Sequence, residues 1–290
     1  MTVKSYVEKH THTLTAKRVA ISGSTGGIGR QLCRHLASLG ATLIMLDRNS
    51  TRSLALADEL KAEFPDLACE HIRVDMEDIA SVKAATEKLL EVGADFLILN
   101  AGAYSIPRKI CDTGYDNVFQ INFIAPYYMA RKLYGAISQR GGRIVAVGSI
   151  AHNYSKTDVN DVDFRTREKA SLVYGNAKRH LMYSLSDFDS DGIISITHPG
   201  ITFTNITAHY PKLIFALIKH PMKIIFMSPR RASLSILLGL FENTEGSSWI
   251  GPRLFNVWGL PKNAPLSTAA KEEREHISRV AEDIFREING

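Results

Sequence analysis

The stretch that decides the fold is Ile21-Ser22-Gly23-Ser24-Thr25-Gly26-Gly27-Ile28-Gly29-Arg30. A β-branched run at residues 18–21 leads into it and predicts a strand, and apolar residues recur at helical spacing from Ile28 to Leu39 after it. The stretch therefore reads as a strand, a glycine-rich turn and the first turn of a helix. Backbone N–H groups and the positive end of a helix dipole meet at such a turn and form a pocket for a pyrophosphate. Taken alone, the turn also fits a tight connection without a ligand.

Composition places the chain among ordinary globular proteins. Its 290 residues are 45% hydrophobic and 22% charged, which is enough for one large α/β domain with a full core. The net charge of +5 comes without a block of Lys and Arg, so no nucleic-acid partner is expected. The scattered cysteines, Cys33, Cys69 and Cys111, are expected to be free thiols.

The polar start of the chain predicts a cytoplasmic protein. Residues 1–17 contain no apolar core of signal-peptide length, and no run in the sequence reaches the length of a membrane span. The His10-Thr11-His12 cluster in this start is expected to be solvated, and no metal site is expected.

From residue 18 to residue 197, apolar strands alternate with amphipathic helices. This alternation predicts an α/β fold, a single domain over residues 1–290 with a Rossmann-type doubly wound parallel sheet and helices on both faces. Pro126 is expected to kink a long helix, and residues 254–257 are expected to form a last strand. The expected strands up to residue 197 are residues 18–21, 42–46, 71–74, 96–99, 143–147 and 193–197. The expected helices after the first are residues 53–64, 79–92, 116–139, 172–188, 230–241 and 271–288.

Charged residues end the second and third strands, at the edge where ligands of such sheets bind. A carboxylate at Asp47 can accept hydrogen bonds from ribose hydroxyls and would repel a 2′-phosphate, whereas Arg48 could pair with that phosphate. Asp75, followed by Met76, is placed to bond an adenine amino group, although an acidic residue after a strand is often only a helix cap.

Small and hydroxyl residues end the fourth and fifth strands. Asn100-Ala101-Gly102 would let the backbone approach a flat ligand, and Asn100 can brace the neighbouring strand. Ser149 ends the fifth strand, and Tyr174 and Lys178 form Y-x-x-x-K on one face of a helix. Each of these features alone is compatible with a purely structural role.

Together, these motifs resemble the short-chain dehydrogenase/reductase family over about residues 17–200. The long interval between Ser149 and Tyr174, and the tail from Trp249 to Gly259, are most similar to its retinol-dehydrogenase-like subgroup. Ser22 stands where that family usually has Thr. The motifs occur in the order Gly23-x3-Gly27-Ile28-Gly29, Asp47, Asp75, Asn100-Ala101-Gly102, Asn122, Gly148-Ser149, Tyr174-x3-Lys178 and Pro199-Gly200.

The resemblance implies a catalytic tetrad and a set of cofactor contacts. Tyr174 would be the general acid/base, Ser149 would hold the substrate oxygen, and Lys178 would bind the nicotinamide ribose and lower the Tyr174 pKa. Asn122 would hold a water in a proton relay to Lys178. The implied cofactor-binding residues are Ser22, Gly23, Ser24, Thr25, Gly27, Ile28, Gly29, Asp47, Arg48, Asp75, Met76, Asn100, Ala101, Gly102, Tyr174, Lys178, Pro199, Gly200 and Thr204.

The expected function is hydride transfer between NAD(P)(H) and a small-molecule alcohol or carbonyl compound. NAD(H) is slightly preferred because of Asp47, and NADP(H) is possible through Arg48. The alternative from another class is a non-catalytic dinucleotide-sensing protein on the same fold, although such proteins usually lack the Tyr or the Lys. A sugar-nucleotide epimerase would resemble G-x-x-G-x-x-G, which the glycine spacing does not fit. A homodimer or homotetramer is possible.

Residues 201–245 are expected to form a C-terminal substrate-lid region. Its segment 210–227 carries two apolar clusters, residues 213–218 and 224–227, separated by Lys219, His220 and Lys223. The segment would cover a lipophilic substrate, pack on the sheet as core, or contact a membrane surface, the last being possible but not favoured.

Overall fold

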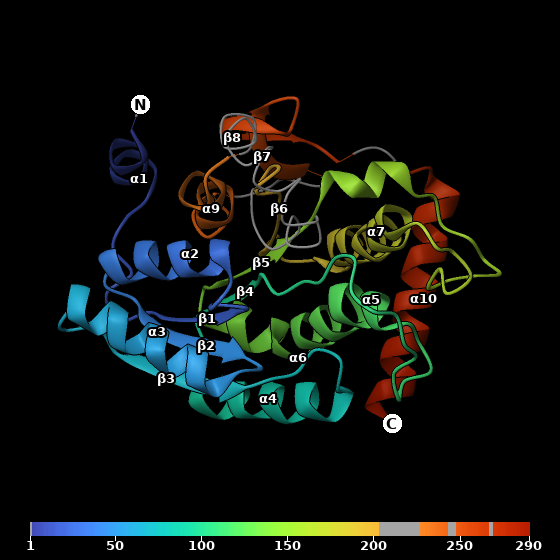
Figure 1. The fold of residues 1–290 in the computed structure, drawn as a ribbon, viewed down its shortest axis with the longest axis horizontal. Helices are drawn as coiled ribbons and strands as arrows, with labels where there is room; N and C mark the ends of the chain where they lie inside the picture. Colours follow the sequence, from blue (N-terminus) through green and yellow to red (C-terminus); the bar gives the residue numbers. More distant parts are fainter. Residues whose placement is uncertain (1, 203–226, 243–247, 267–268) are drawn as a thin grey trace, which may run out of the picture.

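The computed structural model of the protein describes residues 2–202, 227–242, 248–266 and 269–290. Within these residues one sheet of eight strands, in the order β3-β2-β1-β4-β5-β6-β7-β8, forms the middle of the molecule (Figure 1). The first seven strands are parallel, and β8 is antiparallel to β7. The bounds are β1 Arg18–Ser22, β2 Thr42–Asp47, β3 Cys69–Arg73, β4 Phe96–Leu99, β5 Arg143–Val147, β6 Ile194–Thr197, β7 Ser248–Leu254 and β8 Trp258–Pro265.

The strand order reverses at β1, which confirms the predicted doubly wound α/β fold. The chain builds outward from β1 to β3 and then crosses back to place β4 on the other side of β1. Ile21 of β1 pairs with Ile98 of β4, so the turn after β1 and the loop after β4 leave the sheet at the same edge. Ligands of such sheets bind in the crevice that opens at this reversal.

Helices cover both faces of the sheet and form two separate apolar layers with it. One layer joins α1 Val3–His10, α2 Gly27–Ser38, α3 Ser50–Glu63 and α9 Pro229–Leu238 to the sheet. The other joins α4 Ile79–Val92, α6 Ala125–Gln139, α7 Ala170–Phe188 and α10 Lys271–Asn289 to the opposite face. Figure 1 shows α10, in red, beside α7, with which it is in contact. The helices begin where the sequence offers caps, as at Asn49 before α3 and Asp78 before α4.

The long helix predicted over residues 116–139 is divided into three parts. They are α5 Asn117–Phe119, a π-helical segment η1 Gln120–Ile124, and α6. The Ala125 N–H donates to the Gln120 carbonyl five residues back. Pro126 has no N–H to donate to Asn122, so an α-helical hydrogen bond at that position cannot form. Pro126 therefore marks the exit from a π turn that contains Asn122, a type of turn found often at functional sites.

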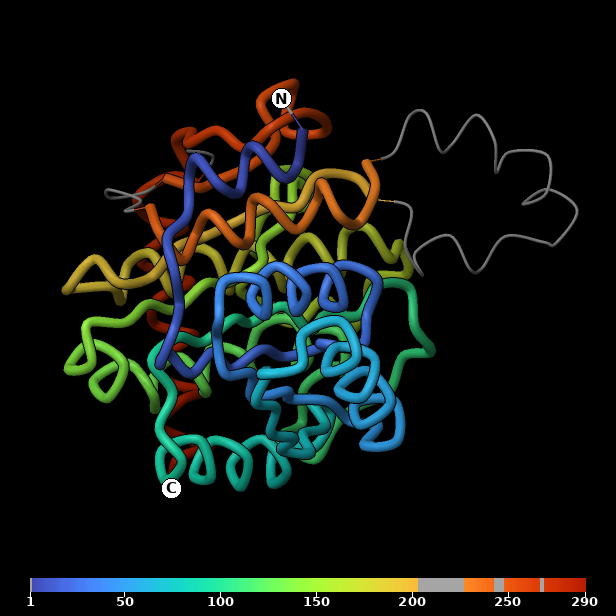
Figure 2. The backbone as a smooth tube through the Cα atoms, turned by 90° about the vertical axis from the view of Figure 1, so that its left-hand side faces the viewer, coloured from blue at the N-terminus to red at the C-terminus, as the bar shows by residue number. Residues whose placement is uncertain are grey.

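One other expectation was wrong. Of residues 254–257, predicted as a last strand, only Leu254 is in a strand, the end of β7, and residues 255–257 form the turn to β8, where Phe255 and Asn256 have positive φ angles of 52° and 57°. The polar start also contains a helix that the sequence did not indicate, α1, which lies beside α9 (Figure 2) and in which Tyr6 and Val7 are buried. His12 is exposed and His10 is half-buried. His10 stacks on the Tyr6 ring at 4.3 Å between centroids.

Within the described part of the chain, no helix combines the length and the apolar character needed to cross a membrane. The three cysteines are free, with Cys33 and Cys111 buried. The described part of the predicted lid region, residues 227–242, consists mainly of α9, whose residues 232–238 are buried. The segment 203–226 and Thr204 lie outside the described residues.

Candidate active site

The glycine turn is shaped by contacts that leave no room for side chains. A Cβ on Gly29 would lie 2.2 Å from the Gly23 carbonyl oxygen, and one on Gly23, whose φ is +68°, would lie 3.0 Å from the Ala101 Cα. Gly26 caps α2 without a side-chain hydrogen bond from the described residues, so the first N–H groups of that helix carry no side-chain cap. Gly26 and Gly27 are exposed. A helix N-terminus with open N–H groups and no Cβ in front of it fits a pyrophosphate.

Ser22 and Asn100 join the turn to the end of β4. The Ser22 Oγ accepts from the N–H groups of Asn100 and Ala101, each at 3.0 Å. The Asn100 amide donates to the carbonyls of Ser22 at 3.0 Å and Gly23 at 3.1 Å. The prediction that Asn100 braces the neighbouring strand is confirmed, and Ser22 shows why a hydroxyl residue precedes Gly23.

Asp47 is engaged by the protein itself. Its side chain is buried, and its carboxylate accepts from the Ser24 hydroxyl, from the Thr25 N–H at 3.2 Å and hydroxyl at 3.1 Å, and from the Ser53 hydroxyl at 3.0 Å. Four donors on two oxygens use the usual capacity of a carboxylate. Asp47 thus ties the glycine turn to β2, a task that the sequence analysis did not foresee.

The neighbours of Asp47 are more open. The Arg48 side chain is 65% exposed, and its Nη1 lies 3.8 Å from Asp75 Oδ2. Asp75 Oδ1 accepts from the Glu77 N–H at 3.1 Å, and the residue that caps α4 is Asp78, so Asp75 is not the helix cap considered for it. Met76 is buried. Arg48 is therefore the more accessible of the two charged groups that end β2.

Ser149, Tyr174 and Lys178 are brought together at the same edge of the sheet. Ser149 follows β5 and caps the short 3₁₀ helix η2 Ile150–Tyr154, accepting from the Ala151 N–H at 3.2 Å. Tyr174 and Lys178 lie one turn apart on α7, and the Lys178 Nζ is 5.8 Å from the centre of the Tyr174 ring. The Lys178 Nζ donates to the Val147 carbonyl at 2.8 Å, which holds α7 against the end of β5.

Burial favours the neutral forms of both α7 groups. It raises the pKa of Tyr174 to about 12, although a hydrogen bond with the Ser149 side chain acts in the opposite direction. It lowers the pKa of Lys178 to about 7. No carboxylate among the described residues forms an ion pair with Lys178 that would offset this burial. Perturbed groups that face each other in this way are typical of functional sites.

Asn122 lies next to Lys178 across the loop that follows β4. Its side chain exchanges hydrogen bonds with the backbone of Ala103, accepting at 3.2 Å and donating at 2.8 Å, and it also donates to Val118. A Cβ on Gly102 would lie 2.8 Å from Asn122 Oδ1 and 3.6 Å from Lys178 Nζ. Gly102 therefore keeps the space between these two groups free.

Pro199 and Gly200 follow β6, the strand that pairs with β5. Gly200 has a φ of +79°, and a Cβ there would lie 2.7 Å from the Val257 carbonyl oxygen. The loop is thus pressed onto the β7–β8 turn. Sequence reasoning missed three residues that hydrogen bonds connect to the segment after Ser149, namely His152, Arg179 and Glu273, because no short motif contains them.

The parallel strands carry an uncapped glycine turn where the strand order reverses, and Ser149, Tyr174 and Lys178 lie at the neighbouring strand ends. These features define a dinucleotide-binding protein of the Rossmann type. The family model described as short chain dehydrogenase matches residues 17–160. The chain belongs to the short-chain dehydrogenase/reductase family, and its relatives include members of the retinol-dehydrogenase-like subgroup.

Several relatives indicate where in the family the chain lies. It is 28% identical to short chain dehydrogenase resG of Aspergillus sclerotiorum, over 67% of this chain and 64% of that protein, slightly under two thirds. It is 29% identical to retinol dehydrogenase 14 of Mus musculus, over 80% of this chain and 76% of that protein. It is 24% identical to polyprenol dehydrogenase of Homo sapiens, over 83% of this chain and 75% of that protein.

Solved structures share the fold. An uncharacterised protein from Mycobacterium paratuberculosis superimposes with a TM-score of 0.73 at 20% identity, covering 96% of this chain and 94% of that one. A short-chain dehydrogenase from Sphingobium yanoikuyae, solved in complex with NADPH, gives a TM-score of 0.59 at 24% identity, covering 77% and 83%. At these identities the likeness shows the fold alone.

Proposed function

We propose that this protein transfers a hydride between NAD(P)(H) and an alcohol or carbonyl compound, with Tyr174 as the general acid/base. The observation that carries the proposal is the convergence of Ser149, Tyr174 and Lys178 at neighbouring strand ends, where the Lys178 Nζ lies 5.8 Å from the centre of the Tyr174 ring and the Ser149 side chain lowers the Tyr174 pKa. A buried lysine whose pKa is lowered to about 7, placed beside a tyrosine on the same helix face, favours a catalytic site over a dinucleotide sensor without catalysis.

The residues around the crevice fit the dinucleotide. The open N-terminus of α2 would hold the pyrophosphate, Asp75 and Met76 the adenine side, and Lys178 the nicotinamide ribose. Pro199, Gly200 and Thr204 would line the nicotinamide side. When bound, the dinucleotide supplies the acceptor or donor of the hydride.

The chain's own residues would manage the proton and the substrate oxygen. The Ser149 hydroxyl would hold that oxygen, and the Tyr174 phenol would take a proton from an alcohol or give one to a carbonyl. Since burial raises the Tyr174 pKa to about 12, the phenol needs a positive charge nearby before it can act as a base at neutral pH. Lys178, with Asn122 on the other side of Gly102, would supply that charge and its path to water.

The choice between the two cofactors rests on Asp47 and Arg48. The preference for NAD(H) requires the Asp47 carboxylate to face the ribose, yet four protein donors already engage it. Arg48 is exposed and close enough to Asp75 for only a weak ion pair. Our proposal is therefore that NAD(H) and NADP(H) are both accepted, within about tenfold of each other, or about 1.4 kcal/mol.

A lipophilic substrate is part of the proposal. Its support comes from relatives named for retinol and polyprenol and from the apolar clusters in residues 213–218 and 224–227. The predicted lid segment 203–226 lies outside the described residues, and α9, in the described part of the predicted lid region, is buried in the core. We also propose that the chain forms a single domain and assembles as a homodimer or homotetramer. A cytoplasmic location, which suits the free thiols, is part of the same proposal.

Cofactor oxidation and reduction, followed optically with a panel of substrates, test this function. Lipophilic alcohols and ketones should give a higher kcat/KM than short polar alcohols or sugars. The control is Tyr174→Phe, which should lower kcat at least 100-fold while cofactor affinity stays within a few fold, because only the proton carrier is removed. Turnover by Tyr174→Phe within 100-fold of wild type would contradict the role of Tyr174 as general acid/base. An equal kcat/KM on the short polar compounds would contradict the proposal of a lipophilic substrate.

A further inference from the structure

We infer that Arg179 and Glu273 are positioning residues, which fix Ser149 toward Tyr174 by clamping the segment 149–157 between α7 and α10. The inference rests on the proposed function, since it concerns the hydroxyl that would hold the substrate oxygen. The two residues are 94 positions apart in the sequence.

The first link of the clamp joins Ser149 to His152. The Ser149 carbonyl accepts from the His152 backbone N–H at 3.2 Å and lies 2.6 Å from the His152 Nδ1. The His152 side chain is buried, and its ring meets the Trp249 ring edge-on at 5.4 Å between centroids. The backbone of Ser149 therefore moves only if His152 moves.

The second link joins His152 to Arg179. The Arg179 side chain is 2% exposed, and its Nη1 donates to the His152 carbonyl at 2.9 Å. Its Nε and Nη2 donate to the two carboxylate oxygens of Glu273, each at 2.7 Å. This fork-to-fork geometry fixes the guanidinium in direction as well as in distance. A lysine could not make the three bonds in the same plane.

The third link returns from Glu273 to the far end of the segment. Glu273 Oε1 also accepts from Thr157, from the N–H at 3.0 Å and from the hydroxyl at 3.3 Å. One carboxylate on α10 thus holds Thr157 directly and His152 through Arg179. Both ends of the chain from His152 to Thr157 are fixed by the same ion pair.

The segment is also pressed against the turn of α7 that carries Tyr174. A Cβ on Gly175 would lie 2.4 Å from the Ala151 carbonyl oxygen, so only glycine permits this approach. The Ser155 hydroxyl donates to the Leu172 carbonyl at 2.7 Å. Loosening the clamp would therefore change the position of the Ser149 side chain relative to Tyr174. The Ser149 side chain is the group that lowers the Tyr174 pKa.

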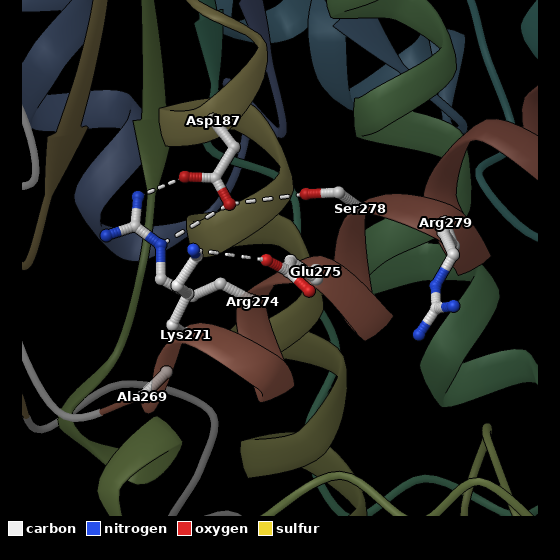
Figure 3. A pocket seen from close by; sticks show the side chains of 7 residues that line it. All are labelled: Asp187, Ala269, Lys271, Arg274, Glu275, Ser278 and Arg279. Carbon is white, nitrogen blue, oxygen red and sulfur yellow. Dashed lines mark hydrogen bonds and ion pairs between the residues drawn. The ribbon is translucent and has the colours of Figure 1, made fainter.

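A second ion pair between the same helices provides a matched control. Arg274 of α10 pairs with Asp187 of α7, and the Ser278 hydroxyl donates to Asp187 at 3.2 Å. Figure 3 shows these groups around an open hollow, together with Lys271 and Glu275. Asp187 lies more than three turns beyond Tyr174 on α7. The pair holds α10 to α7 but lies far from Ser149 along the helix.

The experiment compares Glu273→Gln with Asp187→Asn in the full-length protein. Glu273→Gln keeps the shape of the side chain and breaks the fork. We expect kcat to fall about 10- to 100-fold, the size expected for a reacting group displaced by about 1 Å. The acidic limb of the pH profile for alcohol oxidation should move to higher pH, because Tyr174 loses the hydrogen bond from Ser149. Asp187→Asn should leave both quantities near wild type.

The same substitution in a Ser149→Ala background isolates the route of the effect. If Glu273 acts through Ser149, Glu273→Gln should cost little further activity once the hydroxyl is gone. Full additivity of the two losses would overturn the inference. Arg179→Lys keeps the positive charge and provides a second variant in case Glu273→Gln fails to fold, and it should show the same fall in kcat and the same shift in the pH profile.

Amide hydrogen exchange separates this inference from the proposed function. Glu273→Gln should speed exchange at residues 151–157 at least tenfold over wild type, and Asp187→Asn should not, whether or not the protein turns over any substrate. If wild type turns over no substrate of the panel and this exchange pattern is still observed, the proposed function is wrong and the inference that Arg179 and Glu273 clamp the segment 149–157 still holds. Unchanged exchange in Glu273→Gln would overturn the clamp.

Discussion

The buried ammonium of Lys178 makes the protein less stable than it could be, and replacing it should reveal by how much. Lys178 is 2% exposed, and its Nζ contacts the Val147 carbonyl and the Tyr174 ring. We predict that Lys178→Met abolishes turnover and stabilises the protein without its cofactor at acidic and neutral pH. Methionine fills nearly the same volume and carries no charge to desolvate.

The size of the effect follows from the pKa. Burial lowers the Lys178 pKa from 10.5 to about 7. Each unit corresponds to about 1.4 kcal/mol, so below pH 7 the native state carries a penalty of up to about 5 kcal/mol. Between pH 7 and 10.5 the unfolded chain binds one more proton than the native one, so wild-type stability rises with pH in this window. At pH 9.5 the remaining penalty is about 1.5 kcal/mol.

The assay is urea unfolding of wild type and Lys178→Met at pH 6 and pH 9.5. The variant should gain about 3 kcal/mol more over wild type at pH 6 than at pH 9.5. The lost hydrogen bond to Val147 subtracts a similar amount at both pH values, and all other titrating groups are common to both proteins. A difference between variant and wild type that does not change with pH would refute the reasoning.

Two further predictions follow from the glycine turn and from the end of β2. Gly29→Ala should abolish cofactor binding measured by fluorescence or calorimetry, because its Cβ would lie 2.2 Å from the Gly23 carbonyl oxygen and the turn would have to open; binding within threefold of wild type would contradict this. Arg48→Ala should weaken NADP(H) binding about tenfold, or about 1.4 kcal/mol, and leave NAD(H) nearly unchanged, since only the 2′-phosphate would lose its charge-assisted hydrogen bonds to the exposed guanidinium. An equal loss for both cofactors would contradict this.

The sequence predicted the sheet and the strand ends well, because both depend on local patterns. Buried parallel strands read as apolar runs, and residues such as Asn100 and Ser149 follow them directly. The turn at Phe255 and Asn256 was not predicted because it contains no glycine. A phenylalanine with a positive φ angle also leaves no recognisable pattern in the sequence. Helix α1 escaped because only Tyr6 and Val7 of its residues are buried.

Tertiary pairings were the second part that the sequence could not supply. The position of Asp47 suggested a ribose contact, but only the folded turn brings Ser24, Thr25 and Ser53 onto its carboxylate. Arg179 follows Lys178 directly, yet nothing in the local pattern indicates that its partner is Glu273 on the last helix. The roles of the proposed tetrad remain predictions.

The position of β1 in the sheet has a consequence for how the chain emerges from the ribosome. Strands β2 and β3 are available soon after β1, but its other neighbour, β4, starts only at Phe96. At a synthesis rate of 5–20 residues per second, the edge formed by Val19, Ala20 and Ile21 waits about 4–15 s for that partner. During this interval the nascent chain exposes an unpaired apolar strand edge, and this is when it is most open to pairing with a neighbouring chain and most in need of a chaperone.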